Sequence, residues 1–200
     1  AEILHQNERA FATYLTAFGD PHAQDEDSRL LALVNSYNGG PYKTMLGGLQ
    51  ERLLYYAQAE GVAIPLDQAS GRGTDTTREA LLVVCEQLRN EGKLSLSDDQ
   101  LQRDLAMLGS ETVAFLRSDT MQQLKVAYHD TTGQDLSLLP NQEHLNDSNV
   151  SYGNYGLLAT RGGAYDLIRQ FSEDTRLAKG QTLPTIIARD DSPFRSGNKG

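Results

Sequence analysis

The sequence has one cysteine and no tryptophan among its 200 residues. A single cysteine excludes an intrachain disulfide and every zinc site built mainly from cysteines. No apolar run approaches the roughly 18 residues that a membrane-spanning helix needs, and no charged start followed by an apolar stretch indicates a signal peptide. These absences favour a globular chain in a reducing compartment, in the cytoplasm or in the interior of a host cell.

Basic residues are also scarce relative to acidic ones. The chain has 18 lysines and arginines against 27 acidic residues, a net charge of −9. This balance disfavours general nucleic-acid binding, because phosphates are contacted mainly by lysine and arginine. Residues 179–200 nevertheless carry four basic and two acidic side chains, a net charge of +2. Residues 1–178 therefore have a net charge of −11. We expect a mildly basic C-terminal arm that can dock on an acidic surface.

Apolar residues recur at intervals of three and four throughout the first 128 positions, which is the period of amphipathic helices. Glycine and proline divide this pattern into segments, and serine or threonine at the N-terminal ends can cap them. The predicted helices end before Gly19, span about 27–37 and 41–60, and then begin near Thr76, Ser97 and Ser110. A further helix is expected at about 163–177 and an edge strand at 182–188.

The sequence therefore predicts a mainly α fold, a single domain of six or seven helices over residues 1–178. A long polar excursion interrupts it at about 129–156, with Leu136, Leu138 and Leu139 as apolar anchors. Cys85 recurs at helical spacing with Leu81 and is expected in the core as a small hydrophobic residue. Residues 179–200 are expected to form an extended arm.

The last nine residues match five positions of a known catalytic loop: Pro193, Phe194, Gly197, Asn198 and Lys199. The segment resembles the Fic-domain motif, which implies a transferase that uses a nucleotide. Three chemical positions depart from that motif. Ser192 stands where the family has its base histidine, Ser196 where it has a metal-binding acid, and Gly200 where it has a phosphate-binding arginine.

A second resemblance begins at Tyr128-His129-Asp130 and continues through Tyr155 and Tyr165. This pattern is similar to the diphtheria-toxin-like ADP-ribosyltransferases, in which a strand ends in Tyr-His-Gly-Thr and later tyrosines stack on the nicotinamide of NAD. The resemblance implies catalytic or substrate-binding roles for His129, Asp130, Tyr155 and Tyr165. Asp130 occupies the position of the family's glycine. The alternative interpretation is that His129 and Asp130 end a helix, where an imidazolium is favoured by the helix dipole.

Two glycine turns carry an arginine directly before a predicted helix, one at Arg72 and one at Arg161. Backbone amides and an arginine at a helix N-terminus can hold an anion, and a plain connector is the alternative. The histidines have no metal-ligand spacing, and no cofactor-binding motif occurs. We expect neither a metal site nor a bound cofactor.

The sequence leaves open whether this chain is an enzyme. It favours a protein-interaction or assembly protein that acts through its helical body and its arm, because the arm carries apolar side chains that a solvated tail does not need. The expected binding residues are Ile186, Ile187, Phe194 and Arg195. The alternative is a transferase or secreted effector that uses NAD or ATP.

Overall fold

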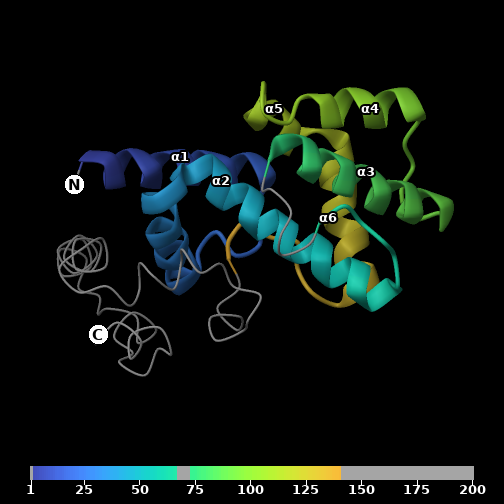
Figure 1. The fold of residues 1–200 in the computed structure, drawn as a ribbon, viewed down its shortest axis with the longest axis horizontal. Coiled ribbons are helices and arrows are strands. Elements are labelled where there is room, and N and C mark those ends of the chain that lie inside the picture. Colours follow the sequence, from blue (N-terminus) through green and yellow to red (C-terminus); the bar gives the residue numbers. More distant parts are fainter. Residues whose placement is uncertain (1, 67–72, 141–200) are drawn as a thin grey trace. The chain divides into compact units, whose positions relative to one another are not determined.

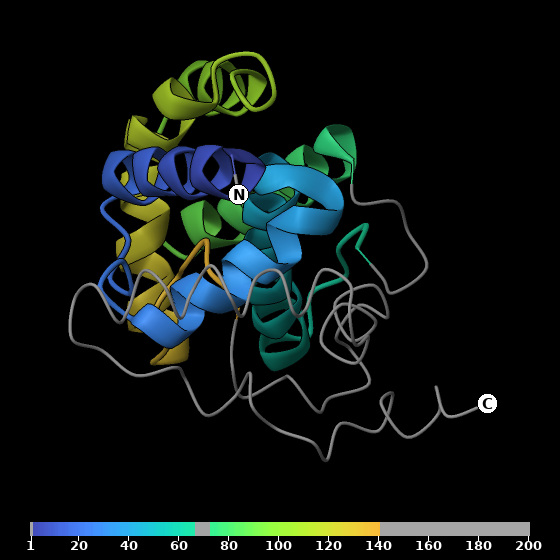
Figure 2. The ribbon, with the colours of Figure 1, turned by 90° about the vertical axis from the view of Figure 1, so that its left-hand side faces the viewer.

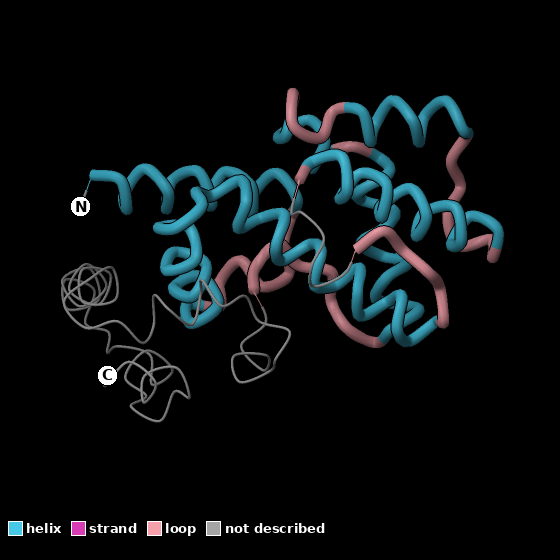
Figure 3. The backbone as a smooth tube through the Cα atoms, in the orientation of Figure 1, coloured by secondary structure: helices cyan, strands magenta, loops and turns pink. Residues whose placement is uncertain are grey.

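A computed structural model describes residues 2–66 and 73–140 of the protein (Figure 1). Within these ranges the backbone forms helices, turns and loops, and no strand (Figure 3). The mainly helical fold predicted from the sequence is confirmed for this part of the chain. The helix expected at 163–177, the strand at 182–188 and the arm at 179–200 lie outside the described residues.

The contacts of the backbone divide the chain into two compact units. The described part of the first unit comprises residues 2–11, 24–44 and 139–140, and that of the second comprises residues 12–23, 45–66 and 73–138. Two helices contribute residues to both units: α1 (Glu2–Phe18) and α2 (Glu26–Glu60). In the first unit, Asn7 of α1 donates its amide to the backbone oxygen and the hydroxyl of Ser36 on α2, at 3.3 and 3.2 Å.

Helix α2 is interrupted at Gly40, whose backbone has φ 86° and ψ 165°. This conformation is open essentially to glycine alone, and Pro41 directly after it is suited to the first turn of a new helix. The sequence therefore predicted the two helical segments and the break between them correctly. Thr44 donates its hydroxyl to the Gly40 carbonyl at 2.9 Å in the first turn after the break.

Four more helices belong to the second unit: α3 (Thr74–Asn90), α4 (Asp98–Ala106), α5 (Thr112–Arg117) and α6 (Asp119–Thr132). Helix α4 contacts α3 and α6, and α5 contacts α6, as Figures 1 and 2 allow the reader to follow. The cap predicted at Ser97 is confirmed, since its side chain accepts from the Gln100 amide. The cap predicted at Thr76 is wrong, because α3 already begins at Thr74 after an extended Gly73.

The helix expected to run unbroken from Ser110 to about residue 127 is two helices. Ser118 has an extended backbone, with φ −60° and ψ 154°, and its side chain accepts from the Met121 amide at the start of α6. Serine competes for backbone hydrogen bonds and is therefore favoured at a helix start over a helix interior. The new helix also runs further than expected, to Thr132, so the predicted polar excursion begins inside a helix.

The core of the second unit follows the apolar faces that the sequence predicted. Cys85 is fully buried on α3, as expected, and so are Leu136 and Leu138. Leu139, which belongs to the first unit, is 1% exposed. The largest fully buried side chains of this unit are Tyr56, Tyr128, Phe18, Phe115, Met45, Leu46, Leu49, Leu53, Leu81, Leu88 and Leu101. None of the described helices combines the length and the apolar character needed to cross a bilayer.

Candidate functional site

Two of the residues suggested for catalysis, His129 and Asp130, lie in the last turn of α6. Both are exposed. The other suggested residues lie outside the described part of the chain. These are the tyrosines Tyr155 and Tyr165, the arm residues Ile186, Ile187, Phe194 and Arg195, and the anion-site arginines Arg72 and Arg161.

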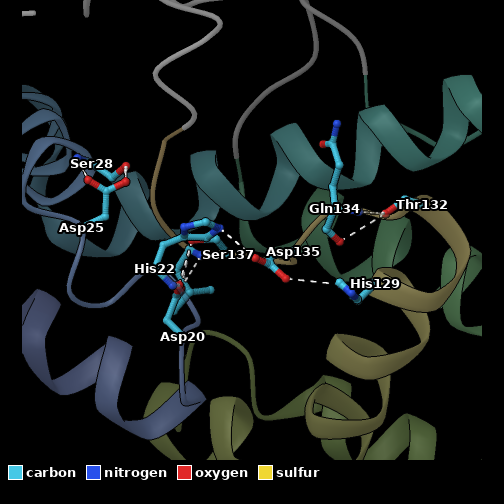
Figure 4. A network of polar contacts seen from close by, with 10 residues as sticks. Asp20, His22, Asp25, Ser28, His129, Thr132, Gln134, Asp135 and Ser137 are labelled. Carbon is cyan, nitrogen blue, oxygen red and sulfur yellow. Dashed lines mark hydrogen bonds and ion pairs between the residues drawn. The ribbon is translucent and has the colours of Figure 1, made fainter.

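His129 belongs to a cluster of three titratable side chains in the second unit (Figure 4). The Asp135 carboxylate lies between two imidazoles: its Oδ2 is 3.1 Å from Nε2 of His22, and its Oδ1 is 3.4 Å from Nδ1 of His129. All three side chains are between 37% and 56% exposed. We call His22, Asp135 and His129 the His–Asp–His cluster.

A second carboxylate, that of Asp20, lies close in sequence to this cluster and is buried, with 6% of the residue exposed. It accepts four hydrogen bonds (Figure 4). The Ser137 hydroxyl donates to both oxygens at 2.9 and 3.1 Å, the Leu138 amide donates at 2.7 Å, and the His22 amide donates at 2.9 Å. Asp20 therefore binds the Ser137 side chain and the Leu138 backbone by direct hydrogen bonds.

Local sequence explains why these groups are placed here. Gly19 and Gly133 adopt left-handed backbones, with φ 67° and 74°, and each follows directly after a helix. Glycine is the residue suited to this position, and it turns the chain sharply away from the helix axis. A carboxylate lies within two residues of each glycine: Asp20 follows Gly19 after α1, and Asp135 follows Gly133 after α6.

The end of α1 that leads into this turn is held by side chains from α6. Lys125 donates to the carbonyls of Phe18 and Gly19, at 2.7 and 3.1 Å, and its ammonium lies 5.0 Å from the centre of the Phe18 ring. Gln122 also donates to the Phe18 carbonyl, at 3.1 Å. A cation near the last carbonyls of a helix is electrostatically favourable. These contacts position Asp20 and His22 opposite residues 133–138.

The geometry of the cluster is that of a structural contact between two parts of the chain, and it does not suit a metal site. The two imidazoles approach opposite oxygens of one carboxylate, whereas metal ligands converge on a single point about 2 Å from each donor atom. Within residues 2–66 and 73–140, no group of three histidine, cysteine, aspartate or glutamate side chains could hold a metal ion. The cluster and Asp20 together link the turn after α1 to the segment after α6.

The described context of His129 differs from the one implied by the resemblance to ADP-ribosyltransferases. In that family the matching residues end a strand, but here Tyr128 and His129 lie within helix α6, and Tyr128 is fully buried. Burial also raises the pKa of the Tyr128 phenol. The position agrees with the alternative that His129 and Asp130 end a helix.

The thiol of Cys85 is inaccessible and neutral. The residue is 0% exposed, and burial, with a smaller contribution from Glu86, raises the pKa of the thiol to about 12. Because the thiolate is the reactive species, this cysteine is inert at neutral pH.

Sequence reasoning missed the contacts of Asp20, His22 and Asp135. His22 and Asp135 are separated by 113 positions, so no short motif joins them. The sequence did hold a weaker indication of the site, since these residues follow glycines that end helices and a carboxylate lies in each turn. A comparison with protein-family models, with curated proteins and with solved structures found no match.

Proposed function

We propose that this chain acts by binding another protein or a second copy of itself, through its helical body and the arm at 179–200. The observation that carries the proposal is the opposite charge of the two parts: residues 1–178 have a net charge of −11, and the arm has +2. The arm also carries the apolar side chains of Ile186, Ile187 and Phe194. Such an arm is suited to dock on an acidic surface with apolar pockets.

The body supports this proposal by presenting carboxylates to solvent. The side chains of Asp75 on α3 and Asp98 on α4 are 92% and 80% exposed, although each contacts an arginine of its own chain. Asp99, Glu111 and Asp119 are exposed as well. Exposed acidic groups of this kind steer a basic partner and raise the rate of its association.

The second support is the role of the titratable side chains near His129. Asp20, His22, His129 and Asp135 bind one another or the backbone around them, which is the arrangement of a structural linkage. Burying Ile186, Ile187 and Phe194 against a partner would contribute about 1.5–3 kcal/mol each, before the loss of conformational entropy as the arm is ordered.

The test is the association state of the full chain against a chain ending at residue 178, measured by analytical ultracentrifugation over a range of concentrations. We expect the truncated chain to keep its helical circular dichroism and to associate more weakly. A triple variant, Ile186→Ser, Ile187→Ser and Phe194→Ser, should have the same effect. Ile3→Ser is the matched control, because Ile3 is an apolar residue of the body that is 63% exposed.

Identical sedimentation of the full and truncated chains, alone and with a candidate partner, would remove the assembly proposal. The alternative, a transferase that uses NAD or ATP, is tested on the same samples by thermal unfolding. A rise in the unfolding temperature with NAD, ADP-ribose or ATP with magnesium would favour it, because a ligand that binds the folded state stabilises that state.

A further inference from the structure

Helix α3 packs one face into the second unit and leaves the opposite face largely uncovered. Its buried residues are Thr77, Ala80, Leu81, Val84, Cys85 and Leu88. Successive residues are about 100° apart around a helix axis, so a different set lies on the opposite side. These residues are Asp75, Glu79, Leu82, Val83, Glu86 and Asn90, and we call them the outer face of α3.

The outer face of α3 is not the uniformly polar surface that an amphipathic helix normally presents to solvent. Leu82 and Val83 lie at its centre and are only half-buried. Glu79 lies one turn before this pair and Glu86 one turn after it, and both glutamates are exposed. Two aliphatic side chains are thus flanked by two carboxylates, which lie about 10 Å apart along the helix axis.

Neighbouring residues occupy an edge of α3 beside its outer face. Arg78, at this edge, donates to the carbonyls of Leu105 and Leu108, at 2.9 and 2.7 Å. Among the residues that the structure describes, Glu79 and Glu86 form neither a hydrogen bond nor an ion pair. Both carboxylates are therefore available to a cationic partner.

The end of the arm has side chains that complement this face. Residues 192–200 contain Phe194, Arg195 and Lys199 and no acidic residue. Four residues of chain reach at most about 14 Å, so the two cations can span the distance of about 10 Å between the two carboxylates. The same sequence therefore carries both halves of a contact that is complementary in charge and in apolar character.

We propose that residues 192–200 of one copy of this chain dock on the outer face of α3 of a second copy. The inference rests on the proposed function and names the surface that the arm uses. The two arm cations pair with the two glutamates, and the Phe194 ring covers the aliphatic pair. Because every copy has both surfaces, two copies can exchange arms and close a dimer.

The contribution of the charges is measured by reversing them in the full chain. An exposed ion pair changes an equilibrium constant by about 1.4- to 5-fold, so losing two pairs weakens association by about 2- to 25-fold. Glu79→Lys with Glu86→Lys removes both pairs and adds repulsion to this loss. Analytical ultracentrifugation over a range of concentrations measures the dissociation constant, and circular dichroism checks that each variant keeps its helices.

The decisive sample adds Arg195→Glu and Lys199→Glu to the α3 variant, which restores opposite charges across the contact. Its dissociation constant should return toward that of the parent. Glu60→Lys with Asp130→Lys is the matched control, because it changes the net charge equally at two exposed residues in the last turns of α2 and α6. The control should stay within about 2-fold of the parent, since a cation is tolerated at a helix C-terminus.

The inference is overturned if the control weakens association as much as the α3 variant does, or if the arm substitutions fail to restore association. A parent protein that stays monomeric would exclude docking between copies. If truncation at residue 178 weakens association but the α3 variant does not, the arm keeps its proposed function and only its docking on α3 is wrong. If truncation has no effect, the proposed function itself fails.

Discussion

The Asp20 carboxylate accepts four hydrogen bonds within the second unit. Its two oxygens satisfy the buried Ser137 hydroxyl and the Leu138 amide in a site where only 6% of the residue is exposed. A buried donor that loses its acceptor costs about 1–3 kcal/mol, because it keeps its desolvation penalty without the compensating bond. Asp20 therefore contributes directly to the anchoring of residues 137–138.

We predict that Asp20→Ala lowers the free energy of unfolding by about 2–3 kcal/mol, since two buried donors are left without their acceptor. Urea denaturation followed by circular dichroism measures the change. Asp130→Ala is the control, because Asp130 is an exposed aspartate in the last turn of α6, and its effect should stay within about 0.5 kcal/mol. Equal effects of the two substitutions would contradict the role given to Asp20.

At the scale of single elements, the sequence predicted helices best where two independent signals agree. On α3 the spacing of Leu81, Val84, Cys85 and Leu88 predicted the buried face, and on α4 the cap at Ser97 coincided with that spacing. The prediction failed at Ser118, because periodic apolar residues continue on both sides of it and hide the break. It also missed the contact between His22 and Asp135, since a contact over more than a hundred positions leaves no local pattern.

Substitution of serine tests whether Ser118, which caps α6 in the structure, or Ser110, which the sequence suggested, is the true helix cap. Ser118→Ala should lower the free energy of unfolding by about 1 kcal/mol, because the Met121 amide loses its acceptor. Ser110→Ala should change it by less than about 0.5 kcal/mol, since Ser110 is exposed and precedes α5 by two positions. A larger loss for Ser110→Ala would favour the single, unbroken helix.

The break in α2 leads to a pair of substitutions with opposite expected signs. Gly40→Ala should destabilise the protein by about 1–3 kcal/mol, because an alanine is strained at φ 86° and ψ 165° even though its Cβ meets no atom within 4 Å. Gly47→Ala lies in the helical part of α2, also with open space, and should stabilise by up to about 1 kcal/mol. Thermal unfolding of both variants would show whether Gly40 is a true interruption, and equal stabilisation by both would argue against it.

At the scale of the whole molecule, three buried weak acids make stability sensitive to alkaline pH. Burial, with smaller contributions from Glu91 and Glu60, raises the pKa of Tyr56 from 10.0 to about 12. Burial raises the pKa of Cys85 from 9.0 to about 12 and also raises that of Tyr128. In the unfolded chain these groups lose their protons at lower pH than in the folded chain, so the folded state binds more protons above about pH 9.

The free energy of unfolding should therefore be fully retained below about pH 9 and fall as the pH rises toward 12. Each group that is ionised only in the unfolded chain contributes a slope of about 1.4 kcal/mol per pH unit. Tyr56→Phe should make the fall less steep between pH 10 and 12. Tyr37→Phe alters a tyrosine that is 41% exposed and is the control. Urea denaturation at a series of pH values measures the slopes, and a slope that Tyr56→Phe leaves unchanged would contradict this account.

The same substitution tests the packing of the Tyr56 hydroxyl near neutral pH. This oxygen is buried and has no hydrogen-bond partner among the residues that the structure describes. Removing a buried polar group without a partner relieves its desolvation penalty, so Tyr56→Phe should leave stability unchanged or raise it by up to about 1 kcal/mol. Denaturation at pH 7 measures this.

The hydrogen bonds from Ser137 and Leu138 to Asp20 span 117 and 118 positions of the chain. Helices α3 to α6 can form from neighbouring residues within microseconds. The hydrogen bonds of Asp20 to Ser137 and Leu138 instead close a very long loop of the chain, and such loop closure slows folding. The second unit comprises residues 12–23 and 45–138, so it is incomplete during synthesis until residue 138 has been added. The turn after α1 is among the first parts of the chain to be made, but it cannot form its hydrogen bonds to Ser137 and Leu138 until those residues have been added.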